Sequence, residues 1–332
     1  MITIKIGAIT NKKIVIAGGT GFIGTALAAY FGNENTITIL TRNTNKPDNN
    51  TYGLTTQPTN QCKYVEWNGK DPGEWCKEID GCDIVINLTG KSVNCRYNNK
   101  NKQEILNSRV NATLAIGHAI QQVVVPPKLW LNASSATIYR HATDQPQDEY
   151  NGEIQDDFSV QVCKKWEEAF FSQRTAFTRK IALRAAITLG VGGVLMPYLH
   201  LAKFGLGGYQ GNGKQMYSWV HINDVCRCIA FFWQHTNLEG VFNISSPNPV
   251  TNKYFMQSLC AAIGQKFAIP AFTWVLKAGA AIIGTETELL LKSRWVLPTK
   301  LLQNGFTFQY PQLNDAIENI VASLPRKAIS IF

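Results

Sequence analysis

Seven residues near the N-terminus constrain the fold of this chain more than any others. The segment Gly18-Gly19-Thr20-Gly21-Phe22-Ile23-Gly24 follows the apolar run Ile14-Val15-Ile16-Ala17. A strand, a glycine turn and a helix in this order open a βαβ unit that binds a dinucleotide. We expect Gly19 to permit the turn, Gly21 to let a pyrophosphate approach the backbone, and Gly24 to let the helix pack closely on the strand. The helix N-terminus then presents free N–H groups to the phosphates.

Strand-like and helix-like segments alternate through the first half of the chain. The strand-like segments are short, apolar and rich in β-branched residues. They are Ile14–Ala17, Thr36–Leu40, Lys63–Trp67, Ile84–Leu88, Leu129–Ala133 and Lys180–Leu183. Amphipathic helices are expected over Phe22–Phe31, Asn101–Val123 and Asp157–Gln173. This order predicts an α/β fold with a doubly wound parallel Rossmann sheet.

The character of the sequence changes after Gly190. Loops rich in glycine, proline and aromatic residues run to Trp219, and a helix near 223–234 and a strand near 241–244 then return to the sheet. Helical segments, with a short extended part near 306–308, make up most of the remainder. A chain of this length exceeds one small core. We therefore predict a Rossmann domain of residues 12–190 and 218–246, and a smaller, mostly helical C-terminal lobe of residues 191–217 and 247–332.

Composition and charge exclude several classes of protein. Of the 332 residues, 45% are hydrophobic and 17% are charged, which is typical of a globular chain. The net charge of +9 is scattered and forms no dense basic helix. It predicts a basic surface with a pocket for an anionic ligand, and no nucleic-acid partner. The longest apolar segment, 268–291, contains Lys277, Glu286 and Glu288, so we expect a buried or amphipathic helix and no membrane span.

The cysteines and the N-terminal residues indicate a cytoplasmic protein. Residues 1–13 lack the pattern of a secretory signal, and the eight cysteines include no CxxC pair. We expect all eight to be reduced thiols. No cluster of His, Cys and Asp has the spacing of metal ligands, so we expect no metal.

The end of the second expected strand indicates which dinucleotide binds. An acid that holds the adenine ribose usually stands there, about 20 residues beyond the glycines. Here the segment reads Leu40-Thr41-Arg42-Asn43, and no carboxylate occurs between Glu34 and Asp48. The guanidinium of Arg42 suits a phosphate, which favours NADP(H) over NAD(H). The alternative is that Arg42 is only a solvated loop residue.

Several motifs resemble those of the extended short-chain dehydrogenase/reductase superfamily. They are the glycine segment, Asn87-Leu88-Thr89-Gly90, and Ser134-Ser135-Ala136-Thr137-Ile138-Tyr139. The C-terminal half is similar to one atypical subfamily, described as nucleoside-diphosphate-sugar epimerase-like and carrying a C-terminal domain of unknown function. The motifs that carry this narrower resemblance are Trp219–Asp224, Ser246–Thr251, Arg294–Pro298, Gly305–Phe308 and Tyr310-Pro311.

The resemblance implies an NADP(H)-binding Rossmann domain and a helical lobe that closes over a small-molecule substrate. A nucleotide sugar is one candidate substrate. The oligomeric state is left open, with a homo-oligomer as one alternative. The implied cofactor-binding residues are Gly18, Gly19, Thr20, Gly21, Phe22, Ile23, Gly24, Thr41, Arg42, Leu88, Thr89, Gly90 and Ser134. Ser135 stands where the superfamily has its catalytic Ser or Thr. A polar segment, Cys95–Asn98 with Lys102, Ser108 and Arg109, matches the subfamily and is expected at the cleft.

The chain departs from the superfamily at the residues that transfer protons. The superfamily uses a Tyr and a Lys four residues later, on one helical face, where the Lys cation lowers the pKa of the Tyr. No tyrosine of this chain has a lysine four residues after it, and the matching positions are Phe158 and Val162. Neither side chain can transfer a proton. The atypical subfamily shares this departure.

Tyr139 is the best substitute in the sequence, because it follows Ser135 near the carboxyl end of a strand. A packed aromatic is the equal alternative. We expect Cys163 in the core and Lys164 and Lys165 in solvent. His221 and Asp224 resemble a catalytic pair, but a helix cap at Asn223 or Asp224 and a buried His221 are the favoured interpretation.

Two functions therefore follow from the sequence. The first is an NADP(H)-dependent oxidoreductase or epimerase-like enzyme with Ser135 and Tyr139 at its active site. The second is a non-catalytic NADP(H)-binding regulator or scaffold, for example in division, which the missing Tyr and Lys favour. The fold alone does not decide between them.

Overall fold

The computed structural model describes residues 7, 9–44, 62–273, 286 and 291–325. Seven parallel strands form the central sheet, in the order β10-β6-β5-β4-β1-β2-β3. They are β1 (Lys13–Ala17), β2 (Thr36–Thr41), β3 (Cys62–Glu66), β4 (Ile84–Asn87), β5 (Leu129–Ser135), β6 (Arg179–Ala185) and β10 (Gly240–Ile244). This is the strand order of a doubly wound Rossmann sheet, so the predicted fold class is confirmed.

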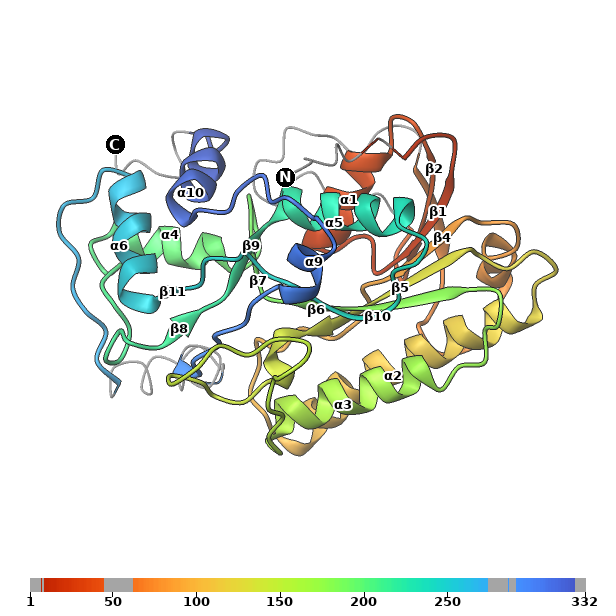
Figure 1. Cartoon of the computed structure of the whole chain (residues 1–332), viewed down its shortest axis with the longest axis horizontal. Coiled ribbons are helices and arrows are strands. Elements are labelled where there is room, and N and C mark those ends of the chain that lie inside the picture. The colour runs from red at the N-terminus through yellow and green to blue at the C-terminus, as the bar shows by residue number, and fades with distance from the viewer. Residues whose placement is uncertain (1–6, 8, 45–61, 274–285, 287–290, 326–332) are drawn as a thin grey trace.

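Helices cover both faces of this sheet (Figure 1). They are α1 (Phe22–Phe31) and α5 (Ile222–Gln234) on one face, and α2 (Asn99–Gln122) and α3 (Phe158–Phe171) on the other. Successive residues of β1 enter opposite cores. Ile14 and Ile16 pack with residues of α1 and α5, whereas Val15 and Ala17 pack with residues of α2 and α3. Burial on both faces explains why the strands are almost continuously apolar.

The winding direction of the chain reverses between β1 and β4. From β1 the chain continues to β2 and β3 on one side, whereas β4 to β6 extend the sheet on the other. Ala17 at the end of β1 pairs with Asn87 at the end of β4. The loops that follow these two strands therefore start side by side, at the place where open α/β sheets bind their ligands.

A second, smaller core lies beside the carboxyl ends of the strands, at the left of Figure 1. Its helices are α4 (Leu195–Lys203), α6 (Asn252–Ala262) and α10 (Leu313–Ala322). Leu199, Phe255 and Ile317 are each at most 1% exposed and belong to this core. Two pairs of short strands lie outside the main sheet: β7 (Ile187–Leu189) with β9 (Trp219–His221), and β8 (Met216–Tyr217) with β11 (Val250–Thr251).

One part of the C-terminal segment packs on the Rossmann core instead of the helical lobe. Leu301 of α9 (Thr299–Gln303) and Phe306 belong to the core that α1 and α5 cover. The Phe306 ring lies 5.3 Å from that of Phe231 on α5. No strand forms over 306–308, where the sequence suggests an extended part. The exact division into two domains remains a prediction.

The described residues also form two short 3-10 helices, η1 (Glu74–Glu78) and η2 (Ala136–Ile138). The eight cysteines all lie in the described part of the chain, and none of them forms a disulfide there. Among the described residues, no helix has the length and apolar character needed to span a membrane. Most of the apolar segment 268–291 lies outside the described residues, as do residues 45–61 of the polar loop after β2.

Candidate cofactor and active site

The glycine loop contains glycines that the fold itself requires and one that it does not. Gly18 has a φ of +75°, which favours glycine. A Cβ on Gly19 would lie 2.9 Å from the Ile39 side chain, and a Cβ on Gly24 would lie 2.5 Å from the Gly19 Cα. A Cβ on Gly21 would meet only the Gly18 carbonyl oxygen, at an ordinary 3.5 Å. Close packing explains why positions 19 and 24 are glycine, whereas a side chain at position 21 would enter open space.

The N-terminus of α1 lies at this open space. Gly21 is its N-cap residue, so no side chain caps the helix, and its first turn contains no acidic residue. The first amides of a helix have no partner within the helix, and its positive end favours an anion. The ring of Phe22 packs under the loop after β7, where a Cβ on Gly192 or Gly193 would lie 3.0 Å from it. The loop geometry fits a pyrophosphate cradle.

The loop after β4 reaches the glycine loop directly. The amide of Leu88 donates to the Ala17 carbonyl over 2.9 Å, and a Cβ on Gly18 would lie 3.1 Å from the Leu88 carbonyl oxygen. The Thr89 amide donates to Asn87 Oδ1 over 3.1 Å. The hydroxyl oxygen of Thr89 is buried and has no hydrogen-bond partner among the described residues. A buried polar atom without a partner is rare and points to a missing ligand or water.

The end of β2 presents Arg42 to solvent. Thr41 is 7% exposed, and its hydroxyl donates to the Asn43 carbonyl over 3.1 Å and accepts from the Asn43 amide over 3.2 Å. These two bonds fix the turn that follows β2. Arg42 lies in this turn and is exposed. Its guanidinium therefore has room to reach a phosphate at the β2 side of the crevice.

Ser134 and Ser135, at the end of β5, have different partners. The Ser134 hydroxyl donates to Glu167 Oε1 over 2.6 Å and is buried. Its side chain belongs to the contact between β5 and α3, which leaves only its backbone for a cofactor. The half-buried Ser135 hydroxyl accepts from the Thr137 amide over 3.2 Å and donates to Thr137 Oγ1 over 2.9 Å. These contacts are local, so the Ser135 hydroxyl can turn to another acceptor.

The structure favours the packed-aromatic interpretation of Tyr139 over the catalytic one. Tyr139 is 2% exposed, its hydroxyl donates to Asn243 Oδ1 over 3.0 Å, and Arg184 Nη1 donates to that hydroxyl over 2.9 Å. Arg184 in turn pairs with Glu167 over 2.7 Å. Burial raises the pKa of the Tyr139 phenol, which makes it a weaker acid. Sequence reasoning missed this buried network, because its members lie on four separate elements.

On α3, the positions that correspond to the Tyr and Lys of the superfamily carry no side chain that can transfer a proton. Phe158 begins the helix, and its ring lies 5.1 Å from that of Tyr97 and 5.2 Å from the Lys102 ammonium. Val162 is 6% exposed. Cys163 is 4% exposed, and burial raises the pKa of its thiol to about 12, so it stays protonated at neutral pH. Lys164 and Lys165 are exposed, as the sequence predicts.

His221 is buried, as expected, but the predicted helix cap is wrong by two or three residues. Its Nδ1 accepts from the Asn223 amide over 3.1 Å, which makes His221 itself the N-cap of α5. Asp224 is fully buried and accepts from the amides of Gln309 and Tyr310 over 2.8 and 2.9 Å, and from Arg227 over 2.7 Å. Both side chains therefore have structural partners.

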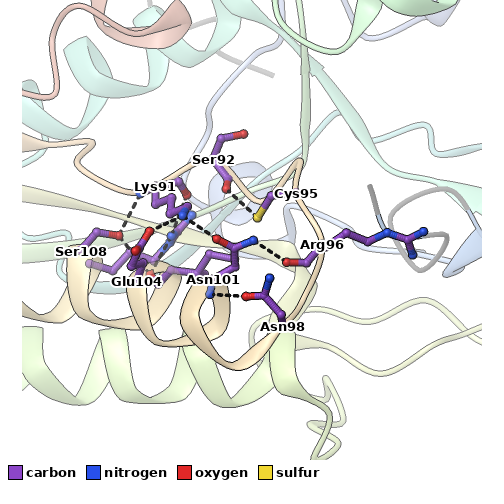
Figure 2. A network of polar contacts seen from close by, with 10 residues as sticks. Lys91, Ser92, Cys95, Arg96, Asn98, Asn101, Glu104 and Ser108 are labelled. Carbon is purple, nitrogen blue, oxygen red and sulfur yellow. Dashed lines mark hydrogen bonds and ion pairs between the residues drawn. The ribbon is translucent and has the colours of Figure 1, made fainter. Parts of the chain in front are cut away.

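A polar network joins the loop after β4 to the first turns of α2, where the sequence places the cleft segment (Figure 2). The Lys91 ammonium contacts the Glu104 carboxylate and donates to Asn101 Oδ1 over 2.8 Å. The Lys91 amide donates to Ser108 Oγ over 2.9 Å. Sequence reasoning missed Lys91, Asn101 and Glu104. Their signal was the spacing of Asn101, Glu104 and Ser108, which places the three residues on one helical face.

Two family models match the chain. The NAD dependent epimerase/dehydratase family matches residues 14–159, and a domain of unknown function (DUF1731) matches residues 271–320. No group of three or more potential metal ligands occurs within the described part of the chain.

Curated relatives and solved structures cover almost the whole chain. An epimerase family protein of Staphylococcus saprophyticus is 32% identical over 93% of this chain and 99% of its own length. The human epimerase family protein SDR39U1 is 29% identical over 93% of this chain and 100% of its own length. The crystal structure of human SDR39U1 (isoform 2) with NADPH superimposes with a TM-score of 0.79, at 27% identity, over 94% of this chain and 99% of that chain.

A more distant structure shares the fold. It is the UDP-N-acetylglucosamine 4-epimerase of Methanobrevibacter ruminantium in complex with UDP-N-acetylmuramic acid. It superimposes with a TM-score of 0.72 at 14% identity, covering 95% of this chain and 98% of that chain.

Proposed function

The chain belongs to the epimerase family of NAD-dependent epimerases and dehydratases, and from this premise we propose an NADP(H)-dependent oxidoreductase or epimerase-like enzyme. The observation that carries the proposal is the open space at Gly21. No protein atom requires a glycine there, yet a side chain would fill the cradle at the N-terminus of α1. A bound pyrophosphate supplies the reason for this glycine.

The residues that would bind the cofactor follow three strands of the sheet, β1, β2 and β4. Gly18, Gly19, Thr20, Gly21, Phe22, Ile23 and Gly24 would hold the pyrophosphate after β1. Thr41 and Arg42 would hold the adenosine phosphate after β2, and Leu88, Thr89 and Gly90 would line the crevice after β4. The preference for NADP(H) rests on the exposed Arg42 and is supported by the NADPH in the human relative's structure. The bound nicotinamide would exchange a hydride with the substrate.

Ser135 is the residue of this chain that would assist the hydride transfer. Its hydroxyl would donate a hydrogen bond to the substrate oxygen whose charge develops during hydride transfer. We withdraw Tyr139 as the proton carrier, because both hydrogen bonds of its buried hydroxyl are structural. Substrates are small molecules with a carbonyl or hydroxyl group. The nucleotide sugar in the Methanobrevibacter epimerase structure makes that class the first to test.

A hydride-transfer screen on NADPH-loaded protein tests this function. The screen covers sugar nucleotides and small carbonyl compounds, with consumption of NADPH as the readout. Ser135→Ala should lower turnover about 100-fold, as the loss of an oxyanion donor does, with unchanged NADPH affinity. Ser172→Ala, at the far end of α3, is the matched control. Normal turnover by Ser135→Ala would refute the assignment.

The second candidate, a non-catalytic NADP(H)-binding regulator or scaffold, rests on Phe158 and Val162. With neither a phenol nor an ammonium at these positions, the helix offers the hydride-transfer reaction no proton. If the protein binds NADPH but transfers no hydride across the whole panel, this second function becomes the better account. In that case Phe158→Tyr combined with Val162→Lys should also remain inactive, because the substrate site itself is absent.

A further inference from the structure

Arg109 lies directly beneath the loop that follows β4. Its Nη1 donates to the Lys91 carbonyl over 3.0 Å and to the Ile105 carbonyl over 2.9 Å. The guanidinium lies over the Trp166 ring of α3, 5.2 Å from its centroid. A Cβ on Gly90 would lie 3.0 Å from the Arg109 Cζ. Since Gly90 has no side chain, the crevice loop can lie directly on the guanidinium.

The charge of Arg109 has no carboxylate partner in the described part of the chain. Its Nε and Nη2 make no hydrogen bond there, and the arginine forms no ion pair. Two other arginines of low exposure have a carboxylate partner: Arg184 pairs with Glu167 over 2.7 Å, and Arg227 pairs with Asp224 over 2.7 Å. Burial lowers the pKa of Arg109, but a guanidinium remains charged at neutral pH. This cation is therefore partly desolvated and lacks a counter-ion.

The surrounding segment cannot supply the missing charge. Between residues 91 and 109 there are five cationic side chains and one carboxylate, a net charge of +4 (5 − 1). That carboxylate is Glu104, and Lys91 already holds it (Figure 2). The hydrogen bond from Lys91 lowers the pKa of Glu104, which keeps it ionised and paired. Excess positive charge beside a crevice attracts anions.

The same network fixes the position of the arginine fork. The Lys91 amide is held by Ser108, and Asn101 Nδ2 donates to the Arg96 carbonyl over 2.8 Å (Figure 2). These bonds hold the loop against α2, so the Lys91 carbonyl that orients Arg109 does not move freely. A preorganised site loses less entropy when it binds a ligand.

We propose that Arg109 binds an oxyanion of the substrate, a carboxylate or a phosphate, beside the loop after β4. The inference rests on the proposed function, because it assumes that a cofactor occupies the crevice. Arg42 follows β2 and the pyrophosphate cradle follows β1, whereas Arg109 lies on α2 and donates to the Lys91 carbonyl in the loop after β4. In the sheet, β4 lies next to β5, which ends at Ser135. The anion at Arg109 is therefore distinct from the phosphates of the cofactor. The free Nε and Nη2 form the planar fork that carboxylates and phosphates fit. The substrate class is thus an anionic compound with a carbonyl or hydroxyl group.

Trp166 provides a reporter for the test, because the guanidinium lies on its ring. Protein saturated with NADP+ is titrated with inorganic phosphate and, separately, with acetate, at constant ionic strength held by chloride. Tryptophan emission is the readout, and Trp166→Phe identifies the signal of this residue. We expect a saturable change that Arg109→Gln weakens by about tenfold or more and Arg109→Lys also weakens, since Lys keeps the charge and loses the fork.

Lys100→Gln is the matched control, because it removes one exposed cation from the same segment and should leave anion binding unchanged. The proposal is overturned if no saturable change occurs, if Arg109→Gln and Arg109→Lys bind like the wild type, or if NADP+ displaces the anion. Failure of the protein to bind NADP+ at all would refute the proposed function, and the titration without NADP+ would then still test Arg109.

Discussion

The two sides of the crevice differ in what surrounds the residues that look functional. On the β1 side, Gly21 faces open space, and the helix behind it has no side-chain cap. On the β5 and α3 side, Ser134 and Tyr139 contact Glu167, Asn243 and Arg184 inside the protein. On the first side, packing within the protein does not explain the glycine at position 21, whereas on the second side protein contacts account for Ser134 and Tyr139.

This difference separates two kinds of function by the residues that each of them requires. Cofactor binding at a glycine loop uses backbone amides and the absence of a side chain, so it depends on few residue types. Proton transfer depends on one titratable side chain in one place. Here the backbone at the N-terminus of α1 has no side-chain cap, as cofactor binding requires, whereas Phe158 and Val162 of α3 carry no titratable group.

The largest effect is expected from Gly21→Val. The Cβ would occupy the pyrophosphate cradle without a clash in the folded protein, so NADPH affinity should fall by more than about 1,000-fold, or about 4 kcal/mol. The free energy of unfolding should change little, because the nearest atom to a Cβ is 3.5 Å away. NADPH titration followed by chemical denaturation measures both. Gly24→Ala is the contrasting variant, and it should lose about 1–3 kcal/mol of stability, because its Cβ would lie 2.5 Å from Gly19.

The second prediction concerns His221, the buried N-cap of α5, which should make the free energy of unfolding depend on pH. Burial lowers its pKa to about 4 from 6.5, so between these values the unfolded chain binds a proton that the native chain does not. Stability should therefore fall as the pH drops from 6.5 to 4, by about 3 kcal/mol in all. His221→Asn keeps a side chain that can cap the helix and should remove this slope. Denaturation at several pH values compares the two proteins, and identical slopes would contradict the account.

A smaller effect is expected from Tyr139→Phe. Loss of the hydroxyl leaves Asn243 Oδ1 and Arg184 Nη1 each without one partner, at a cost of about 1–3 kcal/mol. Because the role of Tyr139 is structural, NADPH affinity and any turnover found in the screen should persist at temperatures where the variant is folded. Loss of turnover by a fully folded variant would restore Tyr139 to the active site.

Much of the fold could be predicted from the sequence. Short apolar runs separated by amphipathic helices give a parallel sheet, and the bounds of α1 match the prediction residue for residue. The position of α9 and Phe306 on the Rossmann core could not be predicted, because an apolar segment does not reveal which of two cores it joins.

The candidate site was predictable where it depends on the backbone and less so where it depends on contacts. Gly21 is recognisable because its residue type and spacing are sufficient. The roles of Tyr139 and Ser134 depend on Glu167, Arg184 and Asn243, which are distant in the sequence. The cap at His221 was missed because imidazole is an unusual N-cap acceptor, and sequence rules favour Asn or Asp.

We propose that the protein binds NADPH through the glycine loop and Arg42. The most direct test of this claim is calorimetric titration of the wild type and of Arg42→Ala with NADPH and with NADH. We expect the wild type to bind NADPH more tightly, and Arg42→Ala to lose about 1.5–3 kcal/mol of affinity for NADPH alone, the contribution of a charge-assisted hydrogen bond. Equal affinities of the wild type for the two dinucleotides, or unchanged NADPH binding by Arg42→Ala, would contradict the claim.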